Sequence, residues 1–198
     1  MTIPHRNKQA AQAGETRARI LDAAARIARE RGARHVTIDA VTAASGLSKG
    51  GVLYHFPSKA ALLAALIARE VEALRARCDA HREAARGAPN PTLRGFLSAL
   101  EQMMDEGDRL PMAILAASAE DPALLDPVRA EFRARWARIA AETAAPDRAF
   151  AIWSAIEGLR LFDMFAAAPE GRAQIRAALP ELRRMIEALP GKEPTDDQ

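Results

Sequence analysis

The sequence predicts an all-α protein, and two observations carry this prediction. Ala, Leu, Arg and Glu dominate the chain, whereas aromatic residues make up only 5% of it. Apolar residues recur at helical spacing, and no run rich in Val, Ile or Thr alternates with period two. Proline and glycine end these stretches, so that about nine helices are expected. A chain of 198 residues suits either one domain or a small domain joined to a larger one, and we expect two units.

The first three helices are expected to form a helix-turn-helix domain over residues 15–62. A helix over residues 16–31 has a continuous apolar stripe and stops at Gly32. Thr37 can cap a short second helix, which a Ser-Gly-Leu turn ends. Ser48 can cap a third helix, which ends at a Phe-Pro pair because proline cannot donate to the helical ladder.

A long fourth helix, from Lys59 to about Arg86, is expected to join this domain to a second helical domain over residues 63–190. The Gly-Ala-Pro-Asn-Pro segment that follows is the clearest loop signal in the chain. Further helices are expected over residues 92–107, 111–120, 122–144, 147–167 and 170–188, with Pro91, Pro111, Pro122, Pro146 and Pro169 marking their starts.

Both ends of the chain are predicted to be disordered, as a basic arm over residues 1–14 and a polar tail over residues 191–198. Basic residues of the arm and of the first helix could reach along a DNA backbone or minor groove. They are His5, Arg6, Lys8, Arg17 and Arg19. The alternative is a leader that only adds solubility.

Charge is distributed unevenly along the chain. Residues 1–60 hold 10 Lys and Arg against 4 Asp and Glu, whereas residues 61–198 hold 18 against 22. A basic head on a mildly acidic helical body is typical of a nucleic-acid-binding domain fused to an effector or assembly domain. Ordinary scatter of surface charge is the alternative interpretation.

The turn and the third helix have the composition of a DNA reader. Two short helices around a glycine-containing turn let one helix enter a major groove while the other braces it. Apolar residues are placed to lock the two helices together, namely Val41, Leu47 and Val52. The residues left facing outward are Ser48, Lys49, Gly51, Tyr54 and His55.

Two glycines and one lysine need an explanation. Gly50 and Gly51 each cost a helix roughly 1 kcal/mol relative to alanine, and close approach to phosphates or base edges would offset this cost. The alternative is that residues 48–51 are simply loop. Lys59 lies at the positive end of a helix dipole, where a bound phosphate would make the cation favourable. The alternative is a solvated lysine.

Residues 37–63 resemble the N-terminal signature of the TetR family, the tetracycline-repressor-like regulators. The alignment has no gaps, and the spacing from Gly46 through Ser48 to Phe56 is kept in full. Five residues depart from the family pattern. The family's usual Thr is Gly51, its usual Tyr is Leu53 and its usual Glu is Ala60, and its small Ala residues before the turn are Thr42 and Ser45.

The resemblance implies a set of contacts with double-stranded DNA. Residues expected to contact phosphates are Thr37, Ser48, Tyr54, His55 and Lys59. Residues expected to lie against base edges are Lys49, Gly50 and Gly51.

The resemblance also implies that the domain over residues 63–190 binds a small-molecule inducer and dimerises. The expected dimer interface comprises the helices near residues 147–167 and 170–188, where a small residue permits close helix contact. The chain would then act as a dimeric repressor that leaves its operator when ligand binds; an activator is the alternative.

Sulfur-containing and aromatic side chains of this domain are candidates for an apolar ligand pocket. The pocket residues that we predict are Met103, Met104, Leu115, Trp136, Trp153, Glu157 and Phe162. Each apolar residue has plain core or interface as its alternative. Glu157, Arg160 and Asp163 would orient a polar ligand group or, alternatively, form ion pairs.

The sequence argues against other classes of protein. The segment 46–50 fits a G-x-S-x-G motif, but a nucleophile elbow needs a strand and a parallel sheet, and no β pattern is present. The four histidines lack metal-ligand spacing, and Cys78 is the only cysteine. We therefore expect no enzyme, no metal, no cofactor and no membrane segment, in a cytoplasmic protein. A helical scaffold that binds no DNA is the remaining alternative.

Overall fold

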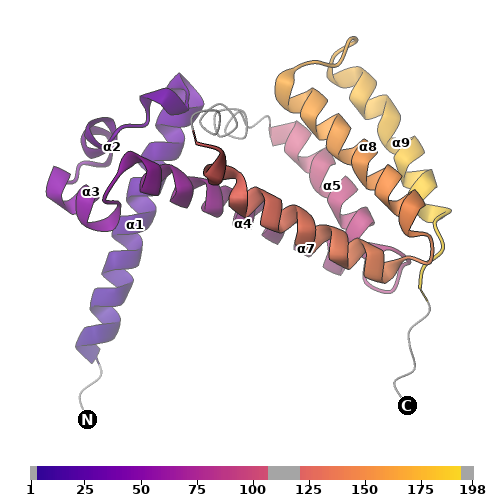
Figure 1. Cartoon of the computed structure of the whole chain (residues 1–198), viewed down its shortest axis with the longest axis horizontal. Coiled ribbons are helices and arrows are strands. Elements are labelled where there is room, and N and C mark those ends of the chain that lie inside the picture. The colour runs from indigo at the N-terminus through magenta and orange to yellow at the C-terminus, as the bar shows by residue number, and fades with distance from the viewer. Residues whose placement is uncertain (1–3, 107–120, 193–198) are drawn as a thin grey trace. The chain divides into compact units, whose positions relative to one another are not determined.

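The structure, a computed structural model, describes residues 4–106 and 121–192 and confirms the all-α prediction (Figure 1). Within these residues the chain forms eight α-helices and no strand. It divides into two compact units, and the division falls inside α4 between Glu70 and Val71. The expected helix over residues 111–120 lies outside the described residues.

The first unit comprises three helices, the first part of α4 and two short 3-10 turns. Their bounds are α1 (Pro4–Arg31), η1 (Ala33–His35), α2 (Ile38–Ser45), α3 (Lys49–His55), α4 (Lys59–Ala84) and η2 (Pro122–Leu125). Its core is the apolar stripe of α1 packed on the inward residues of the later helices. The largest of these buried side chains include Ile20, Leu21, Ile27, Val41, Val52, Phe56, Leu62, Leu66 and Ile67.

The prediction of a disordered arm over residues 1–14 is wrong for residues 4–14, because α1 begins at Pro4. Proline is tolerated in the first turn of a helix, and the Gln- and Ala-rich segment that follows consists of good helix formers. Thr16 does not start the helix, since its hydroxyl donates to the carbonyl of Gln12 at 2.9 Å from within it.

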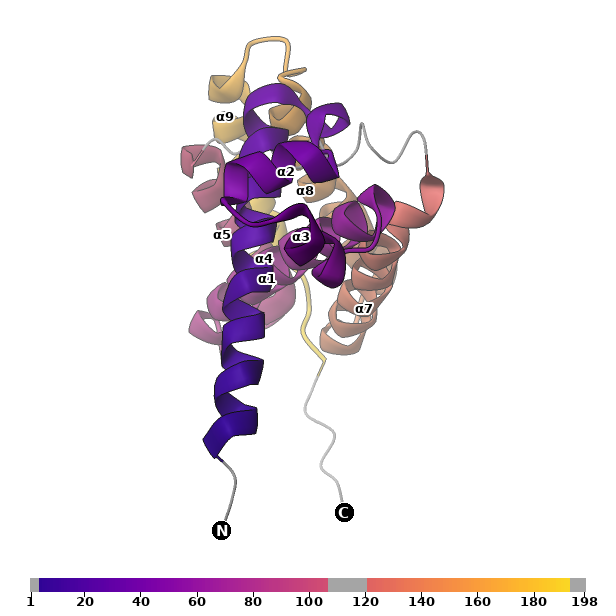
Figure 2. The same cartoon turned by 90° about the vertical axis from the view of Figure 1, so that its left-hand side faces the viewer.

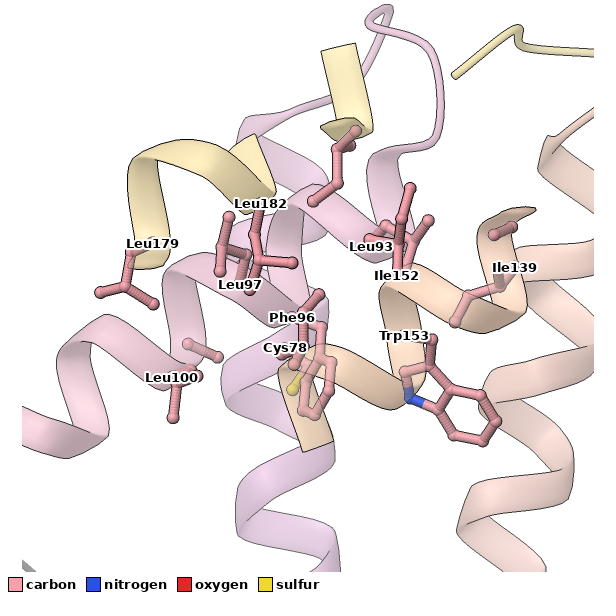
Figure 3. Close-up of a cluster of buried hydrophobic side chains, with 14 of the residues drawn as sticks. Cys78, Leu93, Phe96, Leu97, Leu100, Ile139, Ile152, Trp153, Leu179 and Leu182 are labelled. Carbon is pink, nitrogen blue, oxygen red and sulfur yellow. The ribbon is translucent and has the colours of Figure 1, made fainter. Parts of the chain in front are cut away.

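The second unit comprises the rest of α4 and four helices, α5 (Pro91–Glu106), α7 (Asp126–Glu142), α8 (Pro146–Phe165) and α9 (Arg172–Glu187). Residues of α4, α5, α7, α8 and α9 meet in one apolar cluster, shown in Figure 3. Members of the cluster include Cys78, Phe96, Leu97, Leu100, Ile139, Ile152, Trp153, Leu179 and Leu182.

Helices α4 and α5 approach each other closely at Gly95. A Cβ atom on this residue would lie 2.5 Å from the backbone nitrogen of Arg82 and 2.9 Å from the carbonyl oxygen of Cys78. The Glu142 carboxylate ties the same region together, because it accepts from the Thr92 amide at 2.8 Å and pairs with Arg82 at 3.1 Å. It thereby satisfies an amide at the start of α5.

Several predicted boundaries differ from the structure. The segment predicted as one helix over residues 122–144 is η2 followed by α7. Helix α9 starts after Gly171, which has a φ of 72°, rather than at Pro169. Proline can occupy positions before a helix as well as its first turn, so it marks a start only within a few residues.

The predicted disordered tail is wrong at its first two residues. Gly191 forms an isolated bridge with Thr143, and the Lys192 amide donates to the carbonyl of Glu142 at 2.9 Å. These backbone groups find partners at the α7–α8 connection, a long-range contact that local composition does not encode.

No single helix in the described residues has the length and apolar character of a membrane span. Helices α3 and α4 meet these criteria only as a pair, which is bent by 61°.

Candidate nucleic-acid interface

The turn between α2 and α3 is built by the local residues that the sequence predicted. The Thr37 hydroxyl caps α2 by accepting from the Ala40 amide at 3.1 Å. Gly46 ends α2 in the left-handed region with a φ of 67°, which favours glycine. Ser48 caps α3 by accepting from the Gly51 amide at 3.1 Å. Residues 49–51 are therefore the first turn of a helix, and the loop interpretation is wrong.

Apolar contacts hold the two short helices together. Val41 and Val52 are fully buried, as predicted, and Leu47 in the turn is half-buried. Phe56 is buried behind α3, with the guanidinium of Arg17 5.2 Å from the centre of its ring. Helix α3 is thus packed against the rest of the unit on its inner face, and its outer face is accessible.

Arginines of α1 hold the end of α2. Arg19 donates twice to the carbonyl of Ser45, at 3.0 and 3.2 Å, and Arg26 donates to the carbonyl of Ala44 at 3.0 Å. These carbonyls have no partner within their own helix, so the arginines stabilise its C-terminus. Arg19 therefore stabilises the turn, while Arg17, the other α1 arginine expected to reach DNA, lies over the Phe56 ring. Arg26 was missed because its partner is 18 residues away.

Helix α3 lies on the side of the first unit that faces the viewer in Figure 2, and its residues Lys49, Gly50 and Tyr54 are exposed. Tyr54 is 84% exposed, and its ring meets that of the half-buried His55 edge to face at a centroid distance of 5.2 Å. Lys49 forms an ion pair with Asp39 at 2.8 Å. Both partners are well exposed, so the pair contributes little stability and Lys49 can exchange it for a phosphate.

Packing does not explain both glycines of α3. A Cβ atom on Gly51 would lie 3.3 Å from the capping hydroxyl of Ser48. A Cβ atom on Gly50 would meet no described atom within 4 Å. Protein contacts within the described chain thus leave Gly50 free to be a larger residue.

The remaining residues predicted to contact DNA lie at the starts of helices α2, α3 and α4. Thr37 and Ser48 are exposed caps, and Lys59 is the first residue of α4. The Lys59 ammonium donates to the carbonyl of Arg34 at 3.5 Å, which is at the limit for a hydrogen bond. All eight residues predicted to contact DNA belong to the first unit, on α3 or at the starts of α2 and α4.

The predicted ligand-pocket residues are scattered across the second unit. Trp136 and Trp153 stack with ring centroids 5.8 Å apart, and Met104 is fully buried in the same core. Met103 is half-buried. Phe162 is 47% exposed on α8, so it does not line the interior as predicted. Leu115 lies outside the described residues.

Ion pairs account for the polar residues of α8. Arg160 pairs with Glu157 at 2.7 Å, and Arg172 pairs with Asp163 at 2.5 Å. Glu157 also accepts from Arg135 at 3.3 Å. All three residues therefore form ion pairs within the chain.

The buried thiol of Cys78 lies beside this charged region. Burial raises the pKa of Cys78 above its ordinary value; Arg135 opposes the shift, while Glu131, Asp79 and Glu157 add to it. The neutral thiol is therefore the stable form in the folded chain.

A separate pocket of about 200 Å³ lies between α4, α5 and α9. Its floor is Leu97 and Ile186, and its rim includes His81, Arg94 and Arg183. None of the predicted pocket residues lines it.

The geometry of the first unit defines a class of protein. Two short helices joined by a left-handed glycine turn, the second with Lys and Tyr side chains on its open face, form a helix-turn-helix that binds the major groove of DNA. Two family models match the chain, described as "Bacterial regulatory proteins, tetR family" over residues 20–66 and "Tetracyclin repressor-like, C-terminal domain" over residues 90–187. The chain belongs to the TetR family of DNA-binding transcriptional regulators. Because these regulators are not enzymes, the prediction that the chain is no enzyme is confirmed.

Individual relatives support this assignment. The HTH-type transcriptional regulator CymR of Pseudomonas putida is 29% identical over 126 residues, which are 64% of this chain and 62% of CymR. The chain thus spans less than two thirds of that relative. A TetR-family structure from Streptomyces coelicolor A3 is 26% identical with a TM-score of 0.69, over 87% of this chain and 98% of that one. The multidrug-binding protein EbrR complexed with ethidium is 27% identical with a TM-score of 0.65, over 86% and 98%.

Proposed function

We propose that this chain is a homodimeric repressor that binds a double-stranded DNA operator through α3 and releases it when a small molecule binds to the second unit. The observation that carries the proposal is the open face of α3, where Tyr54 is exposed and Gly50 meets no neighbour. An exposed aromatic side chain beside a lysine and an unobstructed helix backbone suits a close approach to DNA.

The DNA contacts follow from the geometry of the helix starts. Lys49, Gly50 and Gly51 form the first turn of α3, the part of a recognition helix that meets base edges. Hydroxyls at the starts of α2 and α3 would donate to phosphates while their acceptor lone pairs cap the helices. Thr37 and Ser48 would thereby fix the register of the helix on the duplex.

An apolar stripe on α8 supports a dimer. Exposed or half-buried small residues recur along one face of the helix and are followed by large apolar ones. The stripe comprises Ala151, Ala155, Gly158, Leu161, Phe162 and Phe165. Small residues allow two helices to approach closely, and exposed Phe and Leu side chains are stabilised by burial. We assign this stripe, with the exposed Met185 of α9, to the interface with a second copy.

Two comparisons support the proposal that a ligand bound to the second unit releases DNA. The family model for the C-terminal domain covers most of that unit, and EbrR, similar over nearly its whole length, binds ethidium. A dimer that reads two half-sites must hold its α3 helices about 34–36 Å apart. A ligand that favours another spacing would release the duplex by shifting the population of the two states.

The experiment that tests the proposal starts from a random DNA library. The purified chain is used to enrich a duplex, and binding is then measured by gel mobility shift at fixed salt. The double variant Lys49→Ala, Tyr54→Ala should lose binding by at least about ten-fold, because it removes an expected base-edge contact and an expected phosphate contact. Lys192→Ala, an exposed lysine of the second unit, is the control and should bind as the parent does. Failure to enrich any duplex would favour the scaffold alternative.

A further inference from the structure

A charged cluster lies inside the second unit, on the inner faces of α7 and α8. Arg135 is 1% exposed, although it carries a full positive charge. Its guanidinium pairs with Glu131 at 3.1 Å and with Glu157 at 3.3 Å, and it lies 4.4 Å from the centre of the Phe96 ring. A buried arginine needs such partners, because an unpaired charge in the interior is strongly unfavourable.

The cluster is balanced in charge. Arg138 pairs with Asp79 at 2.6 Å and reaches Glu131 at 3.6 Å, while Arg160 pairs with Glu157 at 2.7 Å. Three arginines thus face three carboxylates. The ion pairs by themselves do not call for a ligand of either sign.

The cluster contains more buried hydrogen-bond donors than acceptors that pair with them. Three buried donors have no hydrogen-bond partner among the described residues: the Nε atoms of Arg135 and Arg138 and the indole Nε1 of Trp153. Each is a donor, and two of them belong to guanidinium groups. Buried N–H groups are nearly always paired, so three exceptions on two neighbouring helices require an explanation.

Two of these donors belong to side chains that lie in the core of the second unit, where Phe96 is also buried. Arg135 packs over Phe96, and Figure 3 shows the indole nitrogen of Trp153 on the edge of its ring that faces Phe96 and Cys78. Trp153 is itself only 7% exposed. A hydrogen-bond acceptor that entered between these side chains could receive an N–H from each of them.

We infer that this cluster holds the head group of a carboxylate ligand with an aromatic or apolar body. The inference rests on the proposed function, in that it names the ligand class of the second unit. A carboxylate offers only acceptors, and its two oxygens could accept from the unpaired Nε of Arg135 and Nε1 of Trp153. Hydrogen bonds from guanidinium to carboxylate are stronger than those between neutral groups.

Aromatic side chains lead from the surface to the head-group site. Phe150 is 51% exposed and contacts Trp136 and Trp153, with ring centroids 5.1 and 5.9 Å apart, respectively. Trp136 in turn stacks on Trp153, whose other neighbour is Phe132 at 5.8 Å. An apolar ligand body would take the place of the outer rings of this series and place its carboxylate at the inner end.

A cationic ligand fits the same site less well. Glu131 and Glu157 are already held by arginines, so an ammonium group would have to displace a guanidinium from them. It would also leave the three unpaired donors without an acceptor.

The test uses three probes of similar shape, which are phenylbutyrate, phenylbutyramide and phenylbutylammonium. The two tryptophans of the chain are Trp136 and Trp153, so quenching of intrinsic fluorescence reports binding at this site, and calorimetry gives the dissociation constants. Phenylbutyrate should bind at least about ten-fold more tightly than the amide or the ammonium compound. Equal or tighter binding of either neutral or cationic probe, or no binding of phenylbutyrate, would overturn the inference.

Two matched variants test the donor itself. Trp153→Phe keeps an aromatic ring but removes the unpaired N–H, and it should weaken phenylbutyrate binding by about ten-fold with little effect on the amide. Trp136→Phe is the control, because it removes a stacked indole that has no unpaired buried donor, and it should change all probes alike. The same loss in both variants would overturn the assignment. These variants are preferred to a change at Arg135, which would strand two buried carboxylates.

Measuring whether each compound releases the enriched duplex distinguishes a failure of this inference from a failure of the proposed function. Selective binding of phenylbutyrate without release of the duplex would support the carboxylate site and contradict release by its ligand. Release by a different compound, with no preference for the carboxylate probe, would support ligand release and overturn the carboxylate site.

Discussion

At the scale of single residues, Gly50 separates the requirements of folding from those of DNA binding. Its Cβ position is open, so Gly50→Ala should stabilise α3 by up to about 1 kcal/mol through helix propensity alone. The added methyl group would lie on the proposed DNA-facing turn and should weaken duplex binding by about ten-fold. Denaturant unfolding and gel mobility shift measure the two effects. A variant that gained stability and kept full affinity would remove Gly50 from the interface.

Cys78 gives a pH dependence at high pH. Because burial raises the pKa of this thiol in the folded chain, the unfolded chain ionises first as pH rises. The contribution to stability is complete below the ordinary thiol pKa and is lost as pH rises from about 9 through the higher pKa of the folded state. The free energy of unfolding should therefore fall above pH 9 more steeply in the parent than in Cys78→Ala. Parallel curves would contradict this.

Single residues were predictable where their role is local. Thr37, Gly46 and Ser48 cap or end helices through neighbours within four positions, and each does so in the structure. Arg135 was not singled out, although Glu131 four residues before it is a recognisable helix pair. Its burial depends on Phe96 and Glu157, which only the packing of three helices brings to it.

At the scale of elements, the crossing of α4 and α5 depends on Gly95. A methyl group there would meet the backbone of Arg82, which cannot move without separating the helices. Gly95→Ala should therefore destabilise the second unit by about 1–3 kcal/mol, despite the better helix propensity of alanine. Gly14→Ala, in a helix position with no described atom within 4 Å of the new Cβ, is the matched control and should be neutral or stabilising. Thermal unfolding measures the change in stability of both variants. Equal changes in stability would argue against the close crossing.

The sequence predicted which elements exist better than where they begin. The apolar stripe and Gly32 located the end of the first helix, but its start was placed 12 residues too late, at Thr16 instead of Pro4. The polar composition of this segment predicts disorder, although Gln and Ala are good helix formers. The crossing at Gly95 left no recognisable pattern, because a close approach is defined by the partner helix.

At the scale of the whole molecule, the proposed function requires communication between the DNA-binding unit and the unit proposed to bind a ligand. The first unit has its own core, and the second has another. Helix α4 runs through both units, which makes it the covalent route for any ligand-dependent change. The sequence predicted a continuous helix at this junction and therefore no flexible linker. What it could not supply was the charged cluster, which forms only when α4, α5, α7 and α8 are packed.

Two exposed phenylalanines of α8 provide a test of the proposed dimer. Phe162 and Phe165 are 47% and 44% exposed on the same face of α8, and an aspartate at each would place two charges in an apolar interface. The double variant Phe162→Asp, Phe165→Asp should therefore sediment as a monomer where the parent is a dimer. It should also bind the enriched duplex at least about a hundred-fold more weakly, because one recognition helix then acts without its partner.

A control variant separates loss of the interface from a general effect of charge on α8. Phe150 is also exposed on this helix, but its ring packs against Trp136 and Trp153. Phe150→Asp should change tryptophan fluorescence and keep the dimer. If Phe150→Asp were as fully monomeric as the double variant, the interface would have to lie on another face of α8. If the double variant stayed dimeric with parental affinity for DNA, the second copy would not dock on this stripe.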